Sequence, residues 1–360
     1  MRVYNFAAGP AALPEEVLKR AAAELVEYGS DGMSVMEMSH RSKMYLAIYE
    51  KVDASIRRVM NIPDNYKVLY LQGGATLQFS AIPMNLMKPD KSSADYALSG
   101  NFSKKAYKEA KKYGDARIAG STEDCGFARI PQQNELSLNP GAAYFHYCMN
   151  NTVYGSKWNY IPETGDVPLV CDMSSCILSE PIDVSRFGVI YAGAQKNMGP
   201  SGLTVVIVRK DLLTGSMPFT PTVMDWKTLA EKDSMYNTPS CYGIYFLGLV
   251  LDWIESIGGL EAMKKRNEEK AKLLYDALDK SSFYKTFVEP SARSMMNVTF
   301  NTGDSDLDAK FVKEAAARGI VNIKGYRDLG GMRASIYNAV TLEAVKALVD
   351  FMSDFEKENA

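Results

Sequence analysis

Apolar and polar residues along the chain alternate between helical and extended spacings. Val17, Ala21 and Leu25 recur on one helical face before Gly29, which predicts an amphipathic helix. Ser42 stands where a hydroxyl would cap a second helix. Short, unbroken apolar runs follow, as is typical of strands buried on both faces, at 68–71, 96–98, 142–145, 167–171, 189–191 and 203–208. Helical patterns, such as that at 101–113, separate several of these runs. We therefore expect an α/β fold with a mostly parallel sheet covered by helices.

The pattern of apolar and charged residues changes after residue 257. Two glycines, Gly258 and Gly259, precede a long charged helix at 260–279. Beyond it, strand patterns at 296–300 and 332–336 alternate with helical patterns at 305–318 and 341–355. This change predicts a large domain over 16–257 and a smaller α+β domain over 258–360.

Composition excludes several classes of protein. The chain has 360 residues, 46% of them hydrophobic and 23% charged, which is ordinary for a globular protein, and its net charge is -2. Basic and acidic residues are interspersed, so we expect no nucleic-acid partner. The longest apolar run, 242–251, is about half the length that spans a bilayer, so we expect no membrane segment. Without a signal-like N-terminus, a cytoplasmic location is the simplest expectation.

The cysteines and histidines indicate no metal centre. The five cysteines are scattered and form neither a disulfide framework nor a repeated zinc-binding spacing. Only two histidines occur, and no carboxylate cluster accompanies them. We interpret the cysteines as small buried hydrophobic residues and His146 as a core histidine, and we expect no bound metal.

The strongest chemical signal is a carboxylate and an amine that follow two different strands. Asp172 ends one apolar run, and Lys196 lies just beyond another, in a turn rich in glycine and alanine. Pyridoxal 5′-phosphate (PLP) chemistry needs a lysine that forms a Schiff base and a carboxylate that keeps the pyridine nitrogen protonated. A surface lysine and an acidic helix cap are the alternative for each residue alone, but the pair favours a PLP site.

Two further features suit an anionic cofactor and anionic substrates. The segment Leu-Gln-Gly-Gly-Ala-Thr at 71–76 is a glycine-rich turn before a helix, where backbone amides can bind phosphate, although a turn that only permits packing fits equally well. Arg41, Arg327 and Arg333 can bind carboxylate or phosphate in a bidentate manner. Considered alone, each of these arginines would be interpreted as a solvated surface residue.

Six segments spread along the chain carry a further signal: NFAAGPA at 5–11, SVMEMSHR at 34–41, QGGA at 72–75, AGAQKN at 192–197, YNTP at 236–239 and GGMRASIYNA at 330–339. They resemble the phosphoserine aminotransferase family of class-V aminotransferases, which are fold-type I PLP enzymes. They occur in the family's order over nearly the whole chain. The resemblance implies a seven-stranded type of sheet, an N-terminal segment (1–15) near the active site, and a homodimer whose subunits share their active sites.

The resemblance also implies the residues that hold the cofactor. Lys196 would be the Schiff-base lysine and proton shuttle, Asp172 the partner of the pyridine nitrogen, and Thr152 a contact of the phenolic oxygen. Contacts to the phosphate or the ring would come from Gly74, Ala75, Thr76, Phe102 and Gln195, and from Asn237 and Thr238 of the neighbouring subunit. Phe102 departs from the tryptophan of many members, so we expect weaker stacking on the PLP ring.

The substrate residues follow in the same way. His40 and Arg41 would bind the distal anion of the substrate, helped by Arg327 across the dimer interface, and Arg333 would hold the α-carboxylate. Tyr326 stands where histidine is common, which replaces a possible positive charge with a neutral donor. Glutamate would then donate an amino group to 3-phosphohydroxypyruvate to give O-phosphoserine. A second acceptor in the family, 3-hydroxy-2-oxo-4-phosphobutanoate, belongs to a route to PLP itself.

Three alternatives carry different signals. A cysteine desulfurase or other PLP lyase would share the fold, but no cysteine follows Cys241 to serve as a late catalytic thiol. A nicotinamide-dependent dehydrogenase would use a similar sheet without a lysine-linked chromophore. An inactive binding protein would have no need for both Lys196 and Asp172.

Overall fold

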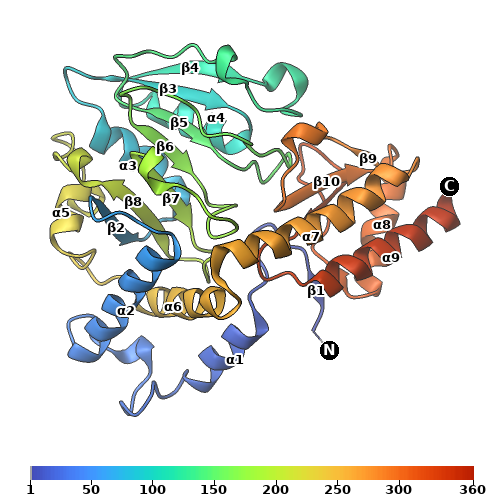
Figure 1. The fold of residues 1–360 in the computed structure, drawn as a ribbon, viewed down its shortest axis with the longest axis horizontal. Coiled ribbons are helices and arrows are strands. Elements are labelled where there is room, and N and C mark those ends of the chain that lie inside the picture. The colour runs from blue at the N-terminus through green and yellow to red at the C-terminus, as the bar shows by residue number, and fades with distance from the viewer. Residues whose placement is uncertain (1) are drawn as a thin grey trace.

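The computed structural model describes residues 2–360 and is organised around a seven-stranded sheet (Figure 1). The strand order is β2-β8-β7-β6-β5-β3-β4. Strand β8 is antiparallel to both of its neighbours, and the remaining pairs are parallel. The strands are β2 (Tyr66–Leu71), β3 (Ser93–Leu98), β4 (Asp115–Ser121), β5 (Phe145–Cys148), β6 (Leu169–Asp172), β7 (Val189–Gly193) and β8 (Thr204–Arg209). The predicted mostly parallel α/β sheet is thus confirmed.

The differences from the predicted elements have local causes. Strand β5 begins at Phe145, the last residue of the apolar run at 142–145. The three residues before it, Ala142 to Tyr144, form the approach to the strand. Strand β4 was missed because it is an edge strand whose exposed residues interrupt its apolar pattern. The first helix, α1 (Glu15–Ala23), ends well before Gly29. Ser42 does cap α2 (Lys43–Val59), since its hydroxyl accepts a hydrogen bond from the Tyr45 N–H at 3.2 Å.

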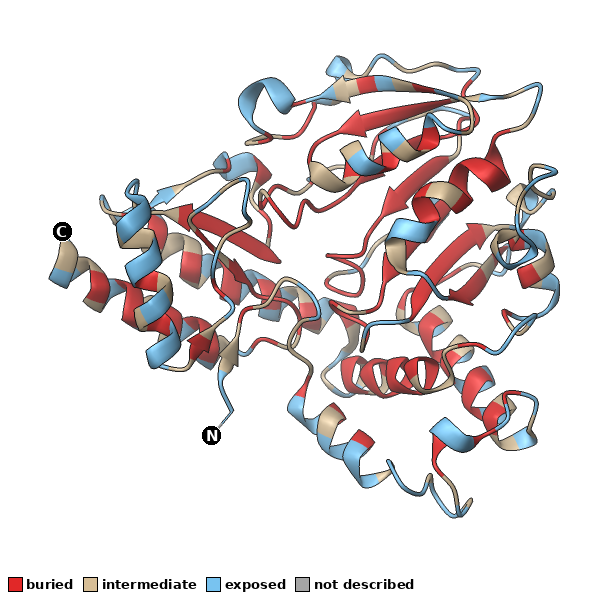
Figure 2. Cartoon of the chain, turned by 180° about the vertical axis from the view of Figure 1, so that it is seen from behind, coloured by how far each residue is buried: buried red, intermediate tan, exposed pale blue. Residues whose placement is uncertain are grey.

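Apart from the edge strand β4, both faces of the sheet are buried, and the strands are largely red in Figure 2. Along β6 the side chains of Leu169 and Cys171 join the core under α1, α2 and α6, whereas Val170 joins the core under α3, α4 and α5. The alternation follows from the two-residue period of a strand. These helices are α3 (Gly74–Leu86), α4 (Asn101–Ala110), α5 (Trp226–Glu231) and α6 (Cys241–Ser256).

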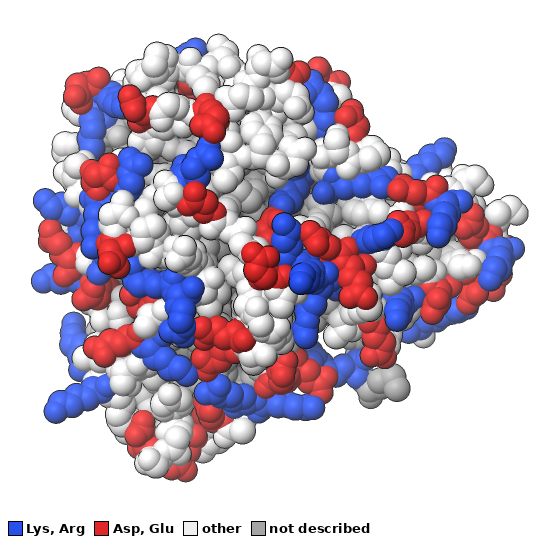
Figure 3. Space-filling model, viewed as in Figure 1, with Lys and Arg blue, Asp and Glu red and all other residues white. Residues whose placement is uncertain are grey.

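The longest apolar run forms helix α6, which is buried on nearly all sides between α2 and the sheet. Among residues 2–360 no single helix has the length and apolar character needed to cross a membrane. Helices α6 and α7 (Gly259–Lys280) pass that test only as a pair, and they are bent by 81° at the break between them. Charged side chains of both signs are interspersed over the face of the molecule in Figure 3.

A second core lies around a three-stranded antiparallel sheet of order β12-β10-β9. Its strands are β9 (Lys285–Thr286), β10 (Asn297–Asn301) and β12 (Met332–Ser335), and its helices are α7 (Gly259–Lys280), α8 (Ser305–Ala317) and α9 (Leu342–Asn359). Helix α7 leads from the large sheet to this smaller unit (Figure 1). The boundary at residue 258 stays a proposal, which the start of α7 at Gly259 supports.

The N-terminal segment contacts both units. Strand β1 (Tyr4–Asn5) pairs with β11 (Ile320–Val321), and Phe6 is part of the smaller core. A few residues later, the Ala11 N–H donates to the Gln195 carbonyl at 2.9 Å. The segment therefore joins the smaller unit to the turn that carries Lys196.

The smaller core gives a stability prediction. Phe311 of α8 is fully buried among the aromatic rings of Tyr284, Phe300 and Phe351. Phe311→Ala is expected to lower the free energy of unfolding by about 3–5 kcal/mol, because it leaves a cavity in addition to the lost burial. Guanidinium-induced unfolding measures this change. The control Lys313→Ala, at an exposed position of the same helix, should stay within about 0.5 kcal/mol of the wild type, and equal effects of the two variants would contradict the assignment.

Candidate active site

A cavity of about 290 Å³ opens at the carboxyl-terminal edge of the parallel strands. Asp172 is the last residue of β6, Lys196 follows β7, and Thr152 follows β5. The carboxyl ends of neighbouring parallel strands meet at one edge, so residues distant in sequence converge there. The cavity is lined by Ala8, Gly9, Gly74, Ala75, Thr76, Phe79, Phe102, Cys148, Asn150, Thr152, Val153, Asp172, Ser174, Ser175, Gln195, Lys196, Tyr326 and Arg333.

Lys196 is held inside the protein with its amine pointing at a hydroxyl. The residue is 8% exposed, and its Nζ donates to Thr152 Oγ1 at 2.8 Å. Burial lowers the pKa of Lys196 to about 8, although the nearby Asp172 carboxylate opposes that change. A lysine with such a pKa has a sizeable neutral fraction near pH 8, and the neutral amine is the form that attacks a carbonyl.

Asp172 presents a buried carboxylate to the same cavity. Burial raises its pKa, and hydrogen bonding to Ser174 together with the charge of Lys196 opposes the rise. The Ser174 N–H donates to Oδ1 at 2.8 Å, while the Cys148 thiol lies 4.0 Å from Oδ2. Oδ2 therefore has only a weak thiol donor in this structure, which leaves it able to accept a further hydrogen bond and to face a cationic N–H group.

The glycine-rich turn forms the N-terminus of α3. Gly73 and Gly74 have φ angles of +89° and +67°, in the left-handed region that favours glycine. This conformation starts the helix at Gly74, and Ala75 and Thr76 of its first turn line the cavity. The first N–H groups of a helix have no partner within it and carry positive partial charge, so this edge of the cavity can bind phosphate.

An aromatic ring and a guanidinium complete the cavity. The centroid of the Phe102 ring lies 5.5 Å from Lys196 Nζ, where the ring can cover a flat cofactor. Arg333 on β12 donates from Nη1 to the Thr152 carbonyl at 3.3 Å, and its buried Nε has no hydrogen-bond partner within residues 2–360. Burial lowers the pKa of Arg333. Its free N–H suits a carboxylate from outside the chain.

The structure brings ten of the fifteen residues expected from the sequence to this cavity and leaves five outside it. The ten are Gly74, Ala75, Thr76, Phe102, Thr152, Asp172, Gln195, Lys196, Tyr326 and Arg333. Arg41, Asn237, Thr238 and Arg327 are exposed and do not line it in the described chain. His40 is buried, and its Nε2 lacks a hydrogen-bond partner among the described residues. The roles of all fifteen stay predictions.

Several cavity residues were missed in the sequence. Ser174 holds the Asp172 carboxylate, and an Asp followed two residues later by Ser is a recognisable Asx-turn signal. Asn150, just beyond β5, donates to Ser175 Oγ at 2.8 Å and to Asn297 Oδ1 at 2.8 Å. Gly9 touches the lysine, since a Cβ there would lie 3.3 Å from Lys196 Cγ. That contact joins distant segments and leaves no local signal in the sequence.

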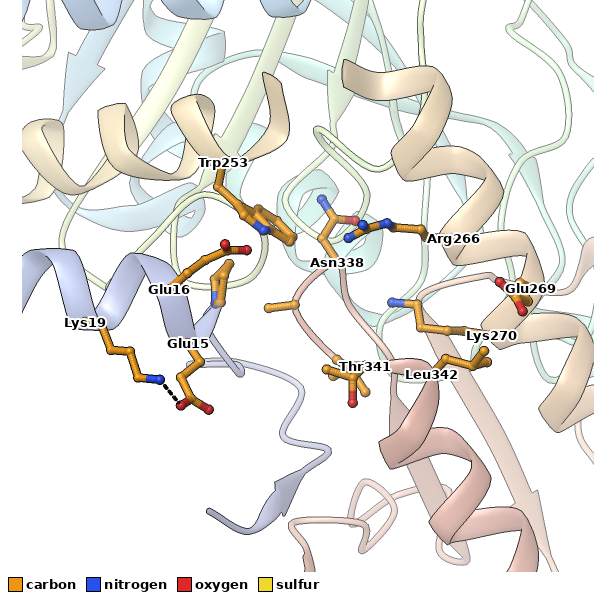
Figure 4. Close-up of a pocket in the computed structure, with 13 residues that line it drawn as sticks. Glu15, Glu16, Lys19, Trp253, Arg266, Glu269, Lys270, Asn338, Thr341 and Leu342 are labelled. Atoms are coloured by element: carbon orange, nitrogen blue, oxygen red, sulfur yellow. Dashed lines mark ion pairs between the residues drawn. The ribbon is translucent and has the colours of Figure 1, made fainter. Parts of the chain in front are cut away.

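A second cavity, of about 570 Å³, lies among α1, α6, α7 and the segment before α9 (Figure 4). It shares no lining residue with the Lys196 cavity. Lys270 is 2% exposed, and its ammonium donates to the Ile336 and Tyr337 carbonyls at 3.1 and 2.7 Å. Lys270 thus ties α7 to the segment that follows β12. Because Glu16 and Arg266 line the same cavity, its walls carry both signs of charge.

The Lys196 cavity fits PLP in each of its parts. It offers an amine for the carbonyl, a carboxylate for the pyridine nitrogen, a ring to cover the flat face, and a helix N-terminus for the phosphate. Within residues 2–360, there is no group of three or more His, Cys, Asp or Glu side chains that could hold a metal ion. The fold and this site define a PLP-dependent enzyme.

Comparisons with known proteins agree with that class. The model of the aminotransferase class-V family matches residues 3–348. The phosphoserine aminotransferase of Pseudomonas aeruginosa is 55% identical over 358 residues, which cover 99% of each chain.

Solved structures extend the agreement to the whole fold. The phosphoserine aminotransferase of Bacillus circulans subsp. alkalophilus superposes with a TM-score of 0.98 at 48% identity, covering 100% of this chain and 99% of that one. The PLP-bound phosphoserine aminotransferase of Trichomonas vaginalis gives a TM-score of 0.94 at 41% identity, covering 98% of this chain and 100% of that one. The chain therefore belongs to the class-V aminotransferases and, within them, to the phosphoserine aminotransferase family. It is a fold-type I enzyme that transaminates and uses PLP.

The pKa of Lys196 gives a pH prediction for the enzyme freed of PLP. Lys196 is expected to bind the PLP carbonyl through its neutral amine, so the rate of cofactor capture should rise with pH through about 8 and level off above it. Stopped-flow absorbance of the lysine-linked cofactor measures this rate. Pyridoxamine 5′-phosphate has no carbonyl, and its binding rate should lack this inflection. A capture rate that is constant from pH 7 to 9 would show that the amine is not the titrating group.

Proposed function

We propose that the enzyme transfers the amino group of L-glutamate to 3-phosphohydroxypyruvate, giving 2-oxoglutarate and O-phospho-L-serine, a step of serine biosynthesis. The observation that carries the proposal is the convergence of Lys196, Asp172 and Arg333 on one cavity. Bound PLP supplies the carbonyl that exchanges with the amino group and a ring that withdraws electrons. The names of the 41–55% identical relatives support phosphoserine as the product.

Lys196 is the proposed base. With PLP and substrate bound, the Lys196 amine would take up the proton at the substrate's α-carbon and return it. The Thr152 hydroxyl, 2.8 Å from Nζ, holds the amine at the cavity wall before substrate enters. Asp172 keeps the pyridine nitrogen protonated through its negative charge. Gln195 and the amides of Ala75 and Thr76 are the proposed phosphate contacts.

The substrates share two anionic ends, and the chain offers basic groups for both. The unpartnered Nε of Arg333 is the proposed site for the α-carboxylate. The distal phosphate or carboxylate is assigned to His40, Arg41 and Arg327, with Tyr326 as a neutral donor. One pair of anion sites can therefore serve glutamate and the phosphorylated 2-oxo acid in turn.

A homodimer with shared active sites would bring the outlying residues to the cavity. Asn237 and Thr238 are exposed, and the Gln72 side chain donates to the Thr238 carbonyl at 3.2 Å, so this loop adjoins the segment just before α3. Two exposed large hydrophobic side chains lie nearby in sequence, Leu77 in the first turn of α3 and Tyr236 just before Asn237. An exposed apolar surface beside a cofactor site suits a partner subunit. Asn237 and Thr238 of the partner subunit are then proposed to reach the cofactor phosphate.

The function is tested by spectroscopy on the purified enzyme with glutamate. Wild type should show a visible band of lysine-linked PLP, which glutamate converts to the pyridoxamine form because the amino group moves to the cofactor. Lys196→Ala should lack that band, whereas Lys105→Ala, which removes a lysine 5.4 Å from the Phe102 ring, should keep it. A wild type that stays colourless with added PLP would contradict the proposal.

The acceptor is tested by comparing 3-phosphohydroxypyruvate with hydroxypyruvate, which lacks the phosphate. Loss of the charge-assisted hydrogen bonds to the phosphate should reduce kcat/KM by roughly 100-fold. The family's second acceptor, 3-hydroxy-2-oxo-4-phosphobutanoate, is proposed as an additional substrate because it carries the same two anionic ends, and its kcat/KM is measured in the same assay. Equal kcat/KM values for hydroxypyruvate and its phosphate would exclude a distal anion site.

Shared active sites are tested by mixing two defective variants. A double variant, Asn237→Ala with Thr238→Ala, should bind PLP weakly, and Lys196→Ala should lack the lysine-linked band. In a mixed dimer, one site would combine an intact Lys196 with intact Asn237 and Thr238 of the partner subunit. After the subunits are exchanged, roughly a quarter of all sites should bind PLP as the wild type does. If these residues serve their own subunit, mixing should restore no sites.

A further inference from the structure

Below the cavity, a histidine and a tyrosine form a hydrogen-bonded pair that the proposed reaction does not yet use. His146 lies on β5 and Tyr191 on β7, and both are fully buried. His146 Nε2 is 2.8 Å from the Tyr191 hydroxyl oxygen. The Tyr96 ring packs against the imidazole at a centroid distance of 4.9 Å. Packing alone does not explain a buried polar pair of this kind, because apolar side chains could fill the same space.

The register of the sheet places the pair beside Asp172. Strand β6 lies between β5 and β7, with Asp172 opposite Tyr191, and Val170 opposite His146. Side chains that oppose one another in a sheet point to the same face, so His146, Asp172 and Tyr191 share the face covered by α3. The pair therefore lies behind the carboxylate, on the side away from solvent.

The protonation states give the hydrogen bonds a direction. Burial lowers the pKa of His146 to about 3, so the imidazole is neutral, and burial raises the pKa of Tyr191, so the phenol keeps its proton. His146 Nδ1 is buried without a partner in residues 2–360. A buried N–H without an acceptor costs more than a free lone pair, so the proton belongs on Nε2. Nε2–H then donates to Tyr191, whose own O–H is free for Asp172.

Asp172 needs such a donor. Its burial favours the neutral acid, which would leave the pyridine nitrogen without its counter-charge. Tyr191 lies opposite Asp172 in the register of β6 and β7, so its O–H is the nearby group whose hydrogen bond would lower the pKa of this carboxyl. A donor whose own oxygen already accepts a hydrogen bond is polarised and donates more strongly. The His146–Tyr191 pair can thus stabilise the charge of Asp172 without touching the cofactor.

We propose that His146 and Tyr191 are positioning residues that hold Asp172 as an oriented carboxylate for the cofactor nitrogen, through the chain His146 Nε2–H to Tyr191 O–H to Asp172. The inference rests on the proposed function, because it assigns Asp172 to the pyridine nitrogen. It gives a role in the reaction to a histidine whose strand position alone indicates a core residue.

The test compares PLP affinity and glutamate kinetics in Tyr191→Phe, His146→Leu and His146→Gln. Tyr191→Phe removes the donor to Asp172 and should weaken PLP binding about tenfold and lower kcat about tenfold, with KM for glutamate changed less than about twofold. His146→Leu should act in the same direction by about threefold. His146→Gln keeps an amide N–H near the position of Nε2 and should bind PLP within about twofold of the wild type.

Tyr144→Phe is the matched control. It removes a buried phenol bonded to the Tyr96 hydroxyl at 2.6 Å, outside the chain to Asp172, and should leave PLP affinity and kcat unchanged. A Tyr191→Phe enzyme that matches Tyr144→Phe in both properties overturns the inference.

If Tyr191→Phe does not fold, the two His146 variants decide, and equal PLP affinities for them overturn the inference. A wild type without the lysine-linked band overturns the proposed function, and the inference with it, whereas unchanged variants of a coloured wild type overturn the inference alone.

Discussion

The site depends on keeping an amine and a carboxylate buried together at one edge of the sheet. Each group alone would lose its charge on burial, and the pKa of Lys196 falls to about 8 while that of Asp172 rises. Their mutual attraction opposes both shifts, and hydrogen bonding to Ser174 opposes that of Asp172. The lysine is thereby kept near the point at which it can act both as nucleophile and as base.

The surrounding structure holds this pair in position. The Asn338 N–H donates to Asn197 Oδ1 at 3.1 Å, which ties the lysine turn to the segment that carries Arg333. The N-terminal segment closes the opposite side, where Gly9 packs on the lysine stem. Arg333 and Lys196, which lie on different units, are thus connected through short polar contacts. Correct geometry at the cavity therefore depends on both hydrophobic cores.

Much of the site could be predicted because the chemistry is carried by local motifs at strand ends. Lys196, Asp172 and the turn at 71–76 each follow an apolar run, and parallel strands bring such positions together. Ser174 had a usable local signal. Gly9 lies in the N-terminal segment that the resemblance placed near the active site, but its contact with Lys196 had no local signal, and neither had the His146–Tyr191 pair, because the partners come from distant parts of the chain. His146 was correctly interpreted as buried, but its tyrosine partner depends on register.

The sequence by itself determined the order of most elements, the buried strands, the cap at Ser42 and the requirement for PLP, because propensity, period and motif act over short stretches. Tertiary structure decided that β4 lies at an edge, that β8 runs antiparallel, and that ten expected residues share one cavity while five stay outside it in the described chain. It also decided the pKa of Lys196, since desolvation depends on every segment that covers the amine. Those properties arise from contacts between residues far apart in the chain, and no local pattern encodes them.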